Sequence, residues 1–347
     1  MTVDIEEVGK AIAYLRKRAG YTQMELAERV GVSDKAVSKW ERGLGLPDTS
    51  IIGKVAILLD TDTDSLLAGD VIHHDTSWRG LLLVDENPYG IGLGTVIYDK
   101  PLVYFLLGYF MLMGVRNIDI VCTESDRSIV EKEFGTGAGY GLNISCMDRL
   151  DQTRYQNTPG NTMIVSGRTI IYGVDQTRFF QKAMFYRDRV TILSLPKKKM
   201  GHPSRIYFNE EKKIVSSEDE GHLVTQYAYH QIPVIFCPNN VIEGVRTDIS
   251  SFYQAIMERL DGEKLYTVAL DRGFVEMSID TWDDVMDASM FVKSIQNACG
   301  MQIYCVEEIA WRRGLISGEQ LRTFAKEKSD TEYGRYIQSF LSEVNSK

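Results

Sequence analysis

Three short helical patterns, each followed by a glycine or a capping residue, strongly constrain the start of this chain. Val8, Ile12 and Leu15 recur at helical spacing, which predicts a helix over residues 4–19. Gly20 follows a basic last turn and is expected to end that helix. Thr22 has a glutamate three residues later, which is the spacing of a capping box and predicts a second helix over residues 23–30.

A tight turn is predicted between this second helix and a third. Gly31 can adopt the left-handed backbone that a sharp turn requires, and Ser33 is a good N-cap for a third helix that runs to about Arg42. Residues 50–59 and 63–67 are predicted as a fourth and a fifth helix. The expected inward side chains of the second and third helices are Leu26, Ala27, Val30, Ala36, Val37 and Trp40.

The segment YTQMELAERVGVSDKAVSKWERG, residues 21–43, resembles the Cro and phage-repressor family of helix-turn-helix proteins. The resemblance covers the five-helix pattern from about residue 6 to residue 68. It implies an all-α, five-helix domain over residues 1–70 that binds double-stranded DNA, with the third helix in the major groove. It also implies a dimer that reads two half-sites about 34 Å apart.

The residues expected to contact DNA lie at the start of the second helix and on the outer face of the third. Gln23 is expected, by the resemblance, to anchor the second helix to a phosphate and to reach a base. Lysines suit guanine acceptors, and Ala36 either touches a thymine methyl group or packs in the core. Lys35, Ser38 and Lys39 are, with Ala36, the candidates for contacts to base edges, and Lys39 and Arg42 alternatively contact phosphates. The full predicted set is Gln23, Ser33, Lys35, Ala36, Ser38, Lys39 and Arg42.

The net charge of −9 does not by itself indicate a nucleic-acid-binding protein. The first 70 residues hold nine basic and twelve acidic side chains, so this part is also net acidic. The basic residues concentrate in the first three predicted helices, whereas Asp60, Asp62, Asp64 and Asp70 lie at the far end. DNA binding is therefore expected from one face only, and it should weaken as salt rises.

Beyond a predicted linker at residues 71–79, strands and helices alternate, which predicts an α/β domain over residues 80–347 with a mixed, largely parallel sheet. Strands are expected at residues 81–84, 119–123, 162–165, 190–195, 205–208, 234–237 and 267–270. Helices are expected at residues 101–113, 128–134, 249–260 and 281–299.

Three stretches of this domain resemble the sugar-1-phosphate nucleotidyltransferases, specifically the glucose-1-phosphate thymidylyltransferases. They are residues 97–126 with the YGLN that follows at 140–143, GRTIIYG at 167–173, and residues 280–336 with VEEIAWRRGLISGEQL and YGRYI. The resemblance implies a Rossmann-like sheet and a homo-oligomer. It also implies nucleotidyl transfer, in which a phosphate cradle, cations and Mg²⁺ stabilise phosphoryl oxygens.

The groups that this chemistry requires are missing from the sequence. The family has a Gly-Gly-x-Gly-Thr-Arg-Leu loop, a lysine and two metal-binding aspartates. Residues 85–101, DENPYGIGLGTVIYDKP, contain no arginine and no lysine before Lys100. Arg168 stands at the first metal aspartate, Ser278 aligns with the second, and residues 216–222 lack the sugar-phosphate lysine. We therefore expect an inactive domain, with no catalytic residue, no metal ligand and no cofactor; Mg²⁺ enters only if the domain is active.

Two features of this domain leave alternatives open. The segment GIGLG is either a plain loop or a phosphate-binding one, and a strand-like segment follows it, which excludes a dinucleotide fingerprint. Arg168 either binds an anion or pairs with a buried carboxylate. The candidate contacts for a sugar nucleotide or sugar phosphate are Gly90, Gly92, Gly94 and Arg168.

The five cysteines have no metal-site or C-x-x-C spacing, which favours reduced, mostly buried thiols. No apolar run is long enough to span a membrane, and the start of the chain lacks a signal-peptide core, so we expect a cytoplasmic protein with no membrane partner. The favoured function is a sequence-specific transcriptional regulator whose second domain dimerises and senses a sugar nucleotide. The alternatives are an active sugar-1-phosphate nucleotidyltransferase that carries a DNA-binding domain, and a scaffold that makes only protein contacts.

Overall fold

The computed structural model describes residues 3–19, 21–59, 61, 63–67, 78–155, 158–185, 187–196, 205–208, 214–215, 229–242 and 265–345. The chain divides into two compact units, Met1–Asp75 and Thr76–Lys347. The predicted helix over residues 249–260, residues 71–77 of the predicted linker and the segment 216–222 lie outside the described residues.

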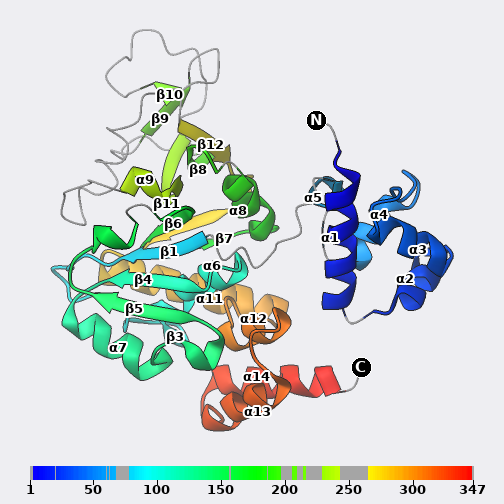
Figure 1. Ribbon diagram of the computed structural model, residues 1–347. Coiled ribbons are helices and arrows are strands. Elements are labelled where there is room, and N and C mark those ends of the chain that lie inside the picture. The colour runs from blue at the N-terminus through cyan, green and yellow to red at the C-terminus, as the bar shows by residue number, and fades with distance from the viewer. Residues whose placement is uncertain are drawn as a thin grey trace. The chain divides into compact units, whose positions relative to one another are not determined.

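The N-terminal unit contains the five predicted helices (Figure 1). They are α1 (Ile5–Arg18), α2 (Gln23–Val30), α3 (Asp34–Glu41), α4 (Ile52–Leu58) and α5 (Thr63–Leu67). The Thr22 hydroxyl accepts the Glu25 N–H, and the Glu25 carboxylate accepts the Thr22 N–H, so the capping box is confirmed. Gly31 has a φ of 90° at the end of α2, which confirms the turn that its position predicts.

The helices of this unit pack around one apolar core. Leu26, Val37 and Trp40 are buried there, as the sequence predicts. One close contact has no signal in the helical pattern: a Cβ atom on Gly9 would lie 2.3 Å from the carbonyl oxygen of Trp40. The absence of a side chain at Gly9 therefore lets α1 and α3 cross closely.

The described residues of the C-terminal unit form a nine-stranded mixed sheet. Its strands are β1 (Trp78–Leu83), β4 (Asn117–Val121), β5 (Asn143–Met147), β6 (Asn161–Ser166), β8 (Val190–Pro196), β9 (Arg205–Phe208), β10 (Ile214–Val215), β11 (Tyr229–Pro238) and β12 (Leu265–Ala269). Along the sheet the order is β10-β9-β11-β6-β1-β4-β5, and β8 joins β11 to β12. Two smaller pairs lie apart from it, β2 (Val96–Ile97) with β3 (Lys100–Pro101) and β7 (Thr169–Tyr172) with β13 (Val275–Ser278).

The sheet is mixed, as predicted, and its described strand pairs are divided equally between parallel and antiparallel. Strand β1 is parallel to both β4 and β6, β4 is parallel to β5, and β8 is parallel to β12. Strand β11, however, runs antiparallel to β6, β8 and β9, and β9 runs antiparallel to β10. The reversal arises at β11, a long strand that serves as the shared partner of three others.

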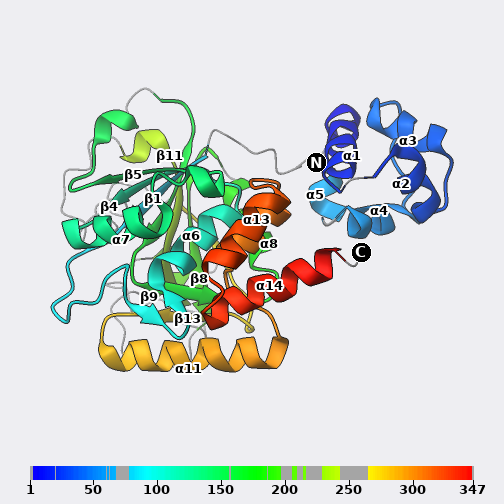
Figure 2. The same ribbon diagram turned by 90° about the horizontal axis from the view of Figure 1, so that it is seen from below.

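Helices cover the sheet of the C-terminal unit (Figures 1 and 2). They are α6 (Leu102–Leu112), α7 (Glu124–Phe134), α8 (Gln176–Phe185), α9 (Asn239–Ile242), α11 (Trp282–Cys299), α12 (Val306–Arg312), α13 (Gly318–Glu327) and α14 (Glu332–Asn345), with the 3₁₀ turns η1 (Ala138–Tyr140) and η2 (Gln152–Arg154). None of the described helices has both the length and the apolar character needed to cross a membrane.

Two predicted boundaries are corrected by the structure. Trp78 and Arg79, which the sequence places in the linker, are the first residues of β1. Thr123, which the sequence places in a strand, is the N-cap of α7, so that helix begins at Glu124 rather than at residue 128. Its hydroxyl accepts the N–H of Asp126, as an N-cap does.

Both faces of the main sheet are buried. Leu82 of β1 packs into the larger apolar cluster with residues of α6 and α7, whereas Leu81 and Leu83 pack into a second cluster on the opposite face. This alternation follows from the two-residue period of a strand.

Candidate functional sites

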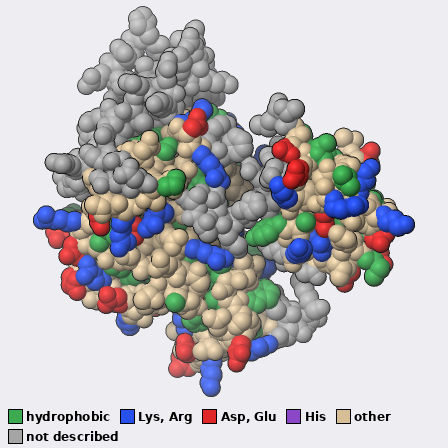
Figure 3. All heavy atoms as spheres, viewed as in Figure 1, with side chains coloured by type: hydrophobic (Ala, Val, Ile, Leu, Met, Phe, Trp, Pro, Cys, Tyr) green, Lys and Arg blue, Asp and Glu red, His purple; other side chains and the backbone are tan. Residues whose placement is uncertain are grey.

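The outward face of α3 carries the predicted DNA contacts. Lys35, Lys39 and Arg42 are exposed, as is Ser33, and Ser38 is partly exposed. Figure 3 shows Lys and Arg side chains gathered on the side of the N-terminal unit where α3 lies. Trp40, on the other side of the helix, is 5% exposed, so its predicted place in the core is confirmed.

Gln23 is held by an ion pair beneath this face. Its side-chain amide donates a hydrogen bond of 2.7 Å to Oε2 of Glu41. The same carboxylate also accepts two hydrogen bonds from Arg16, one from Nε at 2.5 Å and one from Nη2 at 3.1 Å. The bond to Glu41 raises the pKa of Arg16. Arg16, which the sequence counts among the basic residues of this region, is buried in that pair and is not part of the exposed basic face.

Three other predicted contacts have local structural roles. The Ser33 hydroxyl accepts the Ala36 N–H at 3.2 Å and caps α3. Ala36 is partly buried and packs against the core, which is one of its two predicted roles. The Arg42 Nε donates to the Ser38 carbonyl at 3.1 Å, at the carboxyl end of the helix. Lys35 and Lys39, the remaining basic residues of the predicted set, are exposed on the same helix.

The second candidate site is the point where the strand order of the main sheet reverses. From β1 the chain continues to β4 and then β5 on one side, and later returns to β6 on the other side of β1. In open α/β sheets, ligands bind beyond the carboxyl ends of the strands at such a point. The glycine-rich segment follows β1 and Arg168 follows β6, so both lie at this edge. The Arg168 Nη1 donates to the Asp85 carbonyl across it at 2.7 Å.

Arg168 also pairs with a carboxylate that the sequence did not single out. Its Nε lies 2.9 Å from Oδ1 of Asp280, with the arginine side chain 18% and the aspartate 57% exposed. The prediction of a carboxylate partner is thus correct, but the carboxylate is exposed rather than buried. Asp280 lies two residues after Ser278 in the segment EMSID. The Asn87 side-chain amide donates to the Asp280 carbonyl at 2.9 Å.

The amide groups of the glycine-rich loop are bonded within the protein. The N–H of Gly90 donates to the Asn87 carbonyl, and that of Ile91 to the Asn87 side chain at 3.4 Å. The Gly92 N–H donates to the Thr95 hydroxyl at 3.1 Å. The Leu93 N–H donates to Oδ1 of Asp126 at 2.6 Å. Four successive donors are therefore engaged, which favours the plain-loop interpretation over a phosphate cradle.

The glycines of this loop are explained by its approach to α7. A Cβ atom on Gly92 would lie 2.4 Å from the Asp126 carboxylate, and one on Gly94 would lie 3.0 Å from the Ile129 side chain. Gly90 has a φ of 71°, which favours glycine. Asp126, which no sequence motif singled out as part of this site, is only 6% exposed. Its carboxylate also accepts a hydrogen bond of 3.0 Å from the Thr123 hydroxyl.

Two of the carboxylates at this edge are already engaged by donors of the protein. Mg²⁺ prefers carboxylate oxygens, but Arg168 already neutralises Asp280. The Asp284 carboxylate is occupied as well, because it accepts the N–H groups of Asp280 and Thr281 and the Thr281 hydroxyl. Within the described ranges, no three His, Cys, Asp or Glu side chains come together as a metal site.

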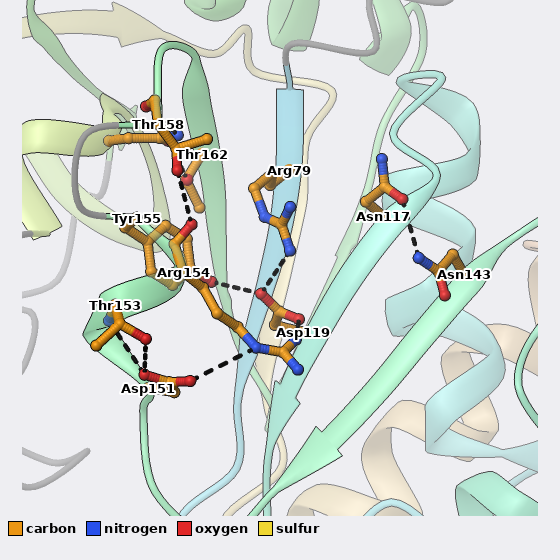
Figure 4. A network of polar contacts seen from close by, with 11 residues as sticks. Arg79, Asn117, Asp119, Asn143, Asp151, Thr153, Arg154, Tyr155, Thr158 and Thr162 are labelled. Atoms are coloured by element: carbon orange, nitrogen blue, oxygen red, sulfur yellow. Dashed lines mark hydrogen bonds and ion pairs between the residues drawn. The ribbon is translucent and has the colours of Figure 1, made fainter.

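A further polar network lies around Asp119 of β4 (Figure 4). The buried Asp119 carboxylate accepts Nη2 of Arg79 at 3.0 Å, Nη1 of Arg154 at 2.5 Å and the Tyr155 hydroxyl at 3.0 Å. Asp151 lies 3.9 Å from Arg154 and balances the second positive charge. This network ties β1, β4 and η2 together, and it has the character of a structural ion-pair cluster.

Comparison with known proteins found relatives for each unit. The sequence model of a helix-turn-helix family (HTH_3) matches residues 12–66. A glucose-1-phosphate thymidylyltransferase of Neisseria meningitidis is 28% identical over 265 residues, which cover 71% of this chain and 90% of the relative. The enzyme of the same name from Mycolicibacterium smegmatis is 26% identical and is covered over 99% of its length.

A solved structure was also found, of a Bacillus anthracis protein described as a glucose-1-phosphate thymidylyltransferase in complex with a sucrose. It covers 62% of this chain and 94% of its own, with 11% identity and a TM-score of 0.48. By the sequence matches, the chain carries a helix-turn-helix unit of the HTH_3 type that is fused to a domain homologous to the glucose-1-phosphate thymidylyltransferases.

Proposed function

We propose that this protein is a sequence-specific transcriptional regulator that binds double-stranded DNA through α3. The observation that carries the proposal is the exposed basic face of α3, at Lys35 and Lys39, within the segment that matches the HTH_3 family. The N-terminal part of a recognition helix enters the major groove in proteins of this kind. The function requires that the protein share a compartment with DNA, and we propose that this compartment is the cytoplasm.

The C-terminal unit has, in this proposal, lost catalysis and kept a regulatory role. The Arg168–Asp280 ion pair supports the loss, because it places a cationic side chain against an exposed carboxylate where a nucleotidyltransferase needs a metal ion. The unit forms a homo-oligomer that brings two helix-turn-helix units to paired half-sites. It binds a sugar nucleotide or sugar phosphate that changes DNA affinity, with a coupling of about 1–3 kcal/mol.

Gel-shift titration of the full chain against a pool of genomic fragments tests the DNA-binding part. We expect DNA fragments to shift at protein concentrations on the order of micromolar or below. The affinity should fall steeply as the salt concentration rises from about 50 to about 200 mM. No shift at any salt concentration would exclude the regulator. Light scattering after gel filtration tests the oligomer, and a monomer at all concentrations would exclude dimerisation through this unit.

A second candidate is an active sugar-1-phosphate nucleotidyltransferase, and the match over 90% of the Neisseria enzyme favours it. This candidate predicts pyrophosphate release from glucose 1-phosphate and a nucleoside triphosphate in the presence of Mg²⁺. We expect no release with any of the common triphosphates. The same triphosphates and their sugar nucleotides, tested by thermal shift, identify a ligand that binds without turnover.

A further inference from the structure

The chain folds back on α3 directly after that helix ends. Gly43 has a φ of 66°, and its N–H donates to the Trp40 carbonyl at 2.9 Å. The next N–H, of Leu44, donates to the Lys39 carbonyl at 3.0 Å. Together these two bonds make a Schellman motif, a turn that reverses the chain at the end of many helices. It places the residue that follows, Gly45, beside the last turn of α3.

Gly45 lies against the side chain of Lys39. A Cβ atom on Gly45 would lie 3.3 Å from Cε, 3.7 Å from Nζ and 3.9 Å from Cδ of Lys39. The end of the lysine therefore occupies space that a side chain at residue 45 would need. The φ of Gly45 lies outside the left-handed region, so its backbone conformation does not require a glycine. The contact with Lys39 gives a reason for a glycine there.

The Lys39 side chain is exposed and yet has a defined place. No hydrogen bond or ion pair ties its ammonium to another of the described residues. Its direction is nevertheless limited, because its outer atoms lie along the loop at Gly45. A lysine that is already placed loses less side-chain freedom on binding than one that moves freely in water. The loop therefore lowers the entropic cost of a contact through this ammonium.

The place of Lys39 favours a contact to the DNA backbone rather than to a base. In helix-turn-helix proteins the N-terminal residues of the recognition helix reach the base edges. Lys39 lies in the last turn of α3, and its end lies along the loop that leaves the helix. A lysine binds a phosphate as a point charge, without the fixed geometry that base recognition requires.

We propose that Gly45 is a positioning residue, whose missing side chain allows Lys39 to contact a phosphate of the bound DNA. The inference rests on the DNA binding proposed above and assigns one of its contacts. In Gly45→Ala the new Cβ forces the outer atoms of Lys39 to move, and the phosphate contact weakens. The fold remains intact, because the atoms that move are the far end of a flexible side chain.

The test compares DNA binding with stability in the full chain. Gly45→Ala should weaken binding to all DNA sequences alike, by about threefold to tenfold, and should reduce the salt dependence of binding by up to about one phosphate contact. Hydrogen exchange of peptides from α3 should be unchanged or slower, because alanine restricts the unfolded chain more than glycine does. A merely structural role of Gly45 would lower stability and DNA binding together.

A second substitution isolates the part played by Lys39. In the Lys39→Gln background, Gly45→Ala should have no further effect on affinity or on salt dependence, because the ammonium that it displaces is gone. The matched control is Gly53→Ala, where an added Cβ meets nothing within 4 Å. No lysine moves in this control, so its DNA affinity should equal that of the wild type.

Several results would overturn the proposal. Wild-type affinity and salt dependence in folded Gly45→Ala would do so and would leave DNA binding by α3 intact. An equal loss of affinity with and without Lys39 would show that Gly45 acts through another group. A loss confined to one DNA sequence would assign Lys39 to a base. Gly45→Ser adds the same Cβ and repeats the measurement, and unfolding of both variants would show that residue 45 supports the fold instead. If the wild type shifts no DNA, the proposed function itself fails.

Discussion

The guanidinium Nε of Arg168 lies 2.9 Å from Oδ1 of Asp280, and this pair joins the end of β6 to the residue before the N-cap of α11. The residues are 112 positions apart in the chain. An arginine here keeps the local charge balanced without an external ion, and its second donor also holds the loop after β1 through the Asp85 carbonyl. The ion pair is therefore a connection between three segments at the edge where a ligand would bind.

Replacing this arginine by a carboxylate should create a cation site. Arg168→Asp places two carboxylates side by side, and we expect Mn²⁺ to bind with a dissociation constant of roughly 1 mM or tighter, measured by electron paramagnetic resonance. The matched control is Arg168→Asn, which removes the positive charge without adding a charged ligand and should gain little affinity. Binding of Mn²⁺ to the wild type as tight as to Arg168→Asp would contradict the role given to the ion pair.

Two glycines of the N-terminal unit should respond to alanine in opposite directions. Gly9→Ala brings a Cβ against the Trp40 carbonyl, so we expect destabilisation of about 1–3 kcal/mol. A Cβ at Gly53, in α4, meets nothing within 4 Å, and Gly53→Ala should stabilise by about 0.5–1 kcal/mol. The change in stability caused by each substitution is measured by hydrogen exchange of peptides from α1 and α3 in the full chain. Equal effects of the two substitutions would show that the close crossing at Gly9 is not needed.

The salt dependence of DNA binding should separate phosphate contacts from base contacts on α3. If Lys39 contacts a phosphate, Lys39→Gln should reduce the slope of the logarithm of the DNA association constant against the logarithm of salt concentration by about 1. It should also weaken binding to all DNA sequences alike. If Lys35 reads a base, Lys35→Gln costs about 1–3 kcal/mol on the preferred site and little elsewhere. The control is Lys10→Gln, which removes an exposed lysine that pairs with Glu6 on α1. Loss of binding in the control equal to that in either variant would argue against recognition by α3.

The capping box of α2 should make the helix-turn-helix unit sensitive to acid. The Thr22 backbone N–H and hydroxyl lower the pKa of Glu25. A carboxyl whose pKa is lowered by folding stabilises the native state above its ordinary pKa, and this contribution is lost as pH falls through the lowered value. We expect an NMR titration to place the pKa of the Glu25 carboxyl below that of an ordinary glutamate. Glu25→Gln should flatten the acid dependence of α2 hydrogen exchange, and Glu28→Gln, on the same helix, should leave it unchanged.

Local features of the sequence were sufficient to predict the N-terminal unit. Thr22, Gly31 and Ser33 act within a few residues of themselves, so their effects can be inferred without the rest of the fold. The same reasoning identified Trp40 as a core residue and the outer side of α3 as the exposed face. It did not reveal the ion pair between Arg16 and Glu41, because those residues are 25 positions apart.

The C-terminal unit depended more on its tertiary structure. Residue patterns indicated most of the strands, and the motif at residues 167–173 indicated a charge reversal at Arg168. The pairing of β11 with three strands, the Asp126 contact to Leu93 and the choice of Asp280 as the partner of Arg168 were decided only by folding. Short-range hydrogen bonds and side-chain periodicity are encoded locally, whereas the approach of distant segments depends on how the whole sheet and its helices pack together.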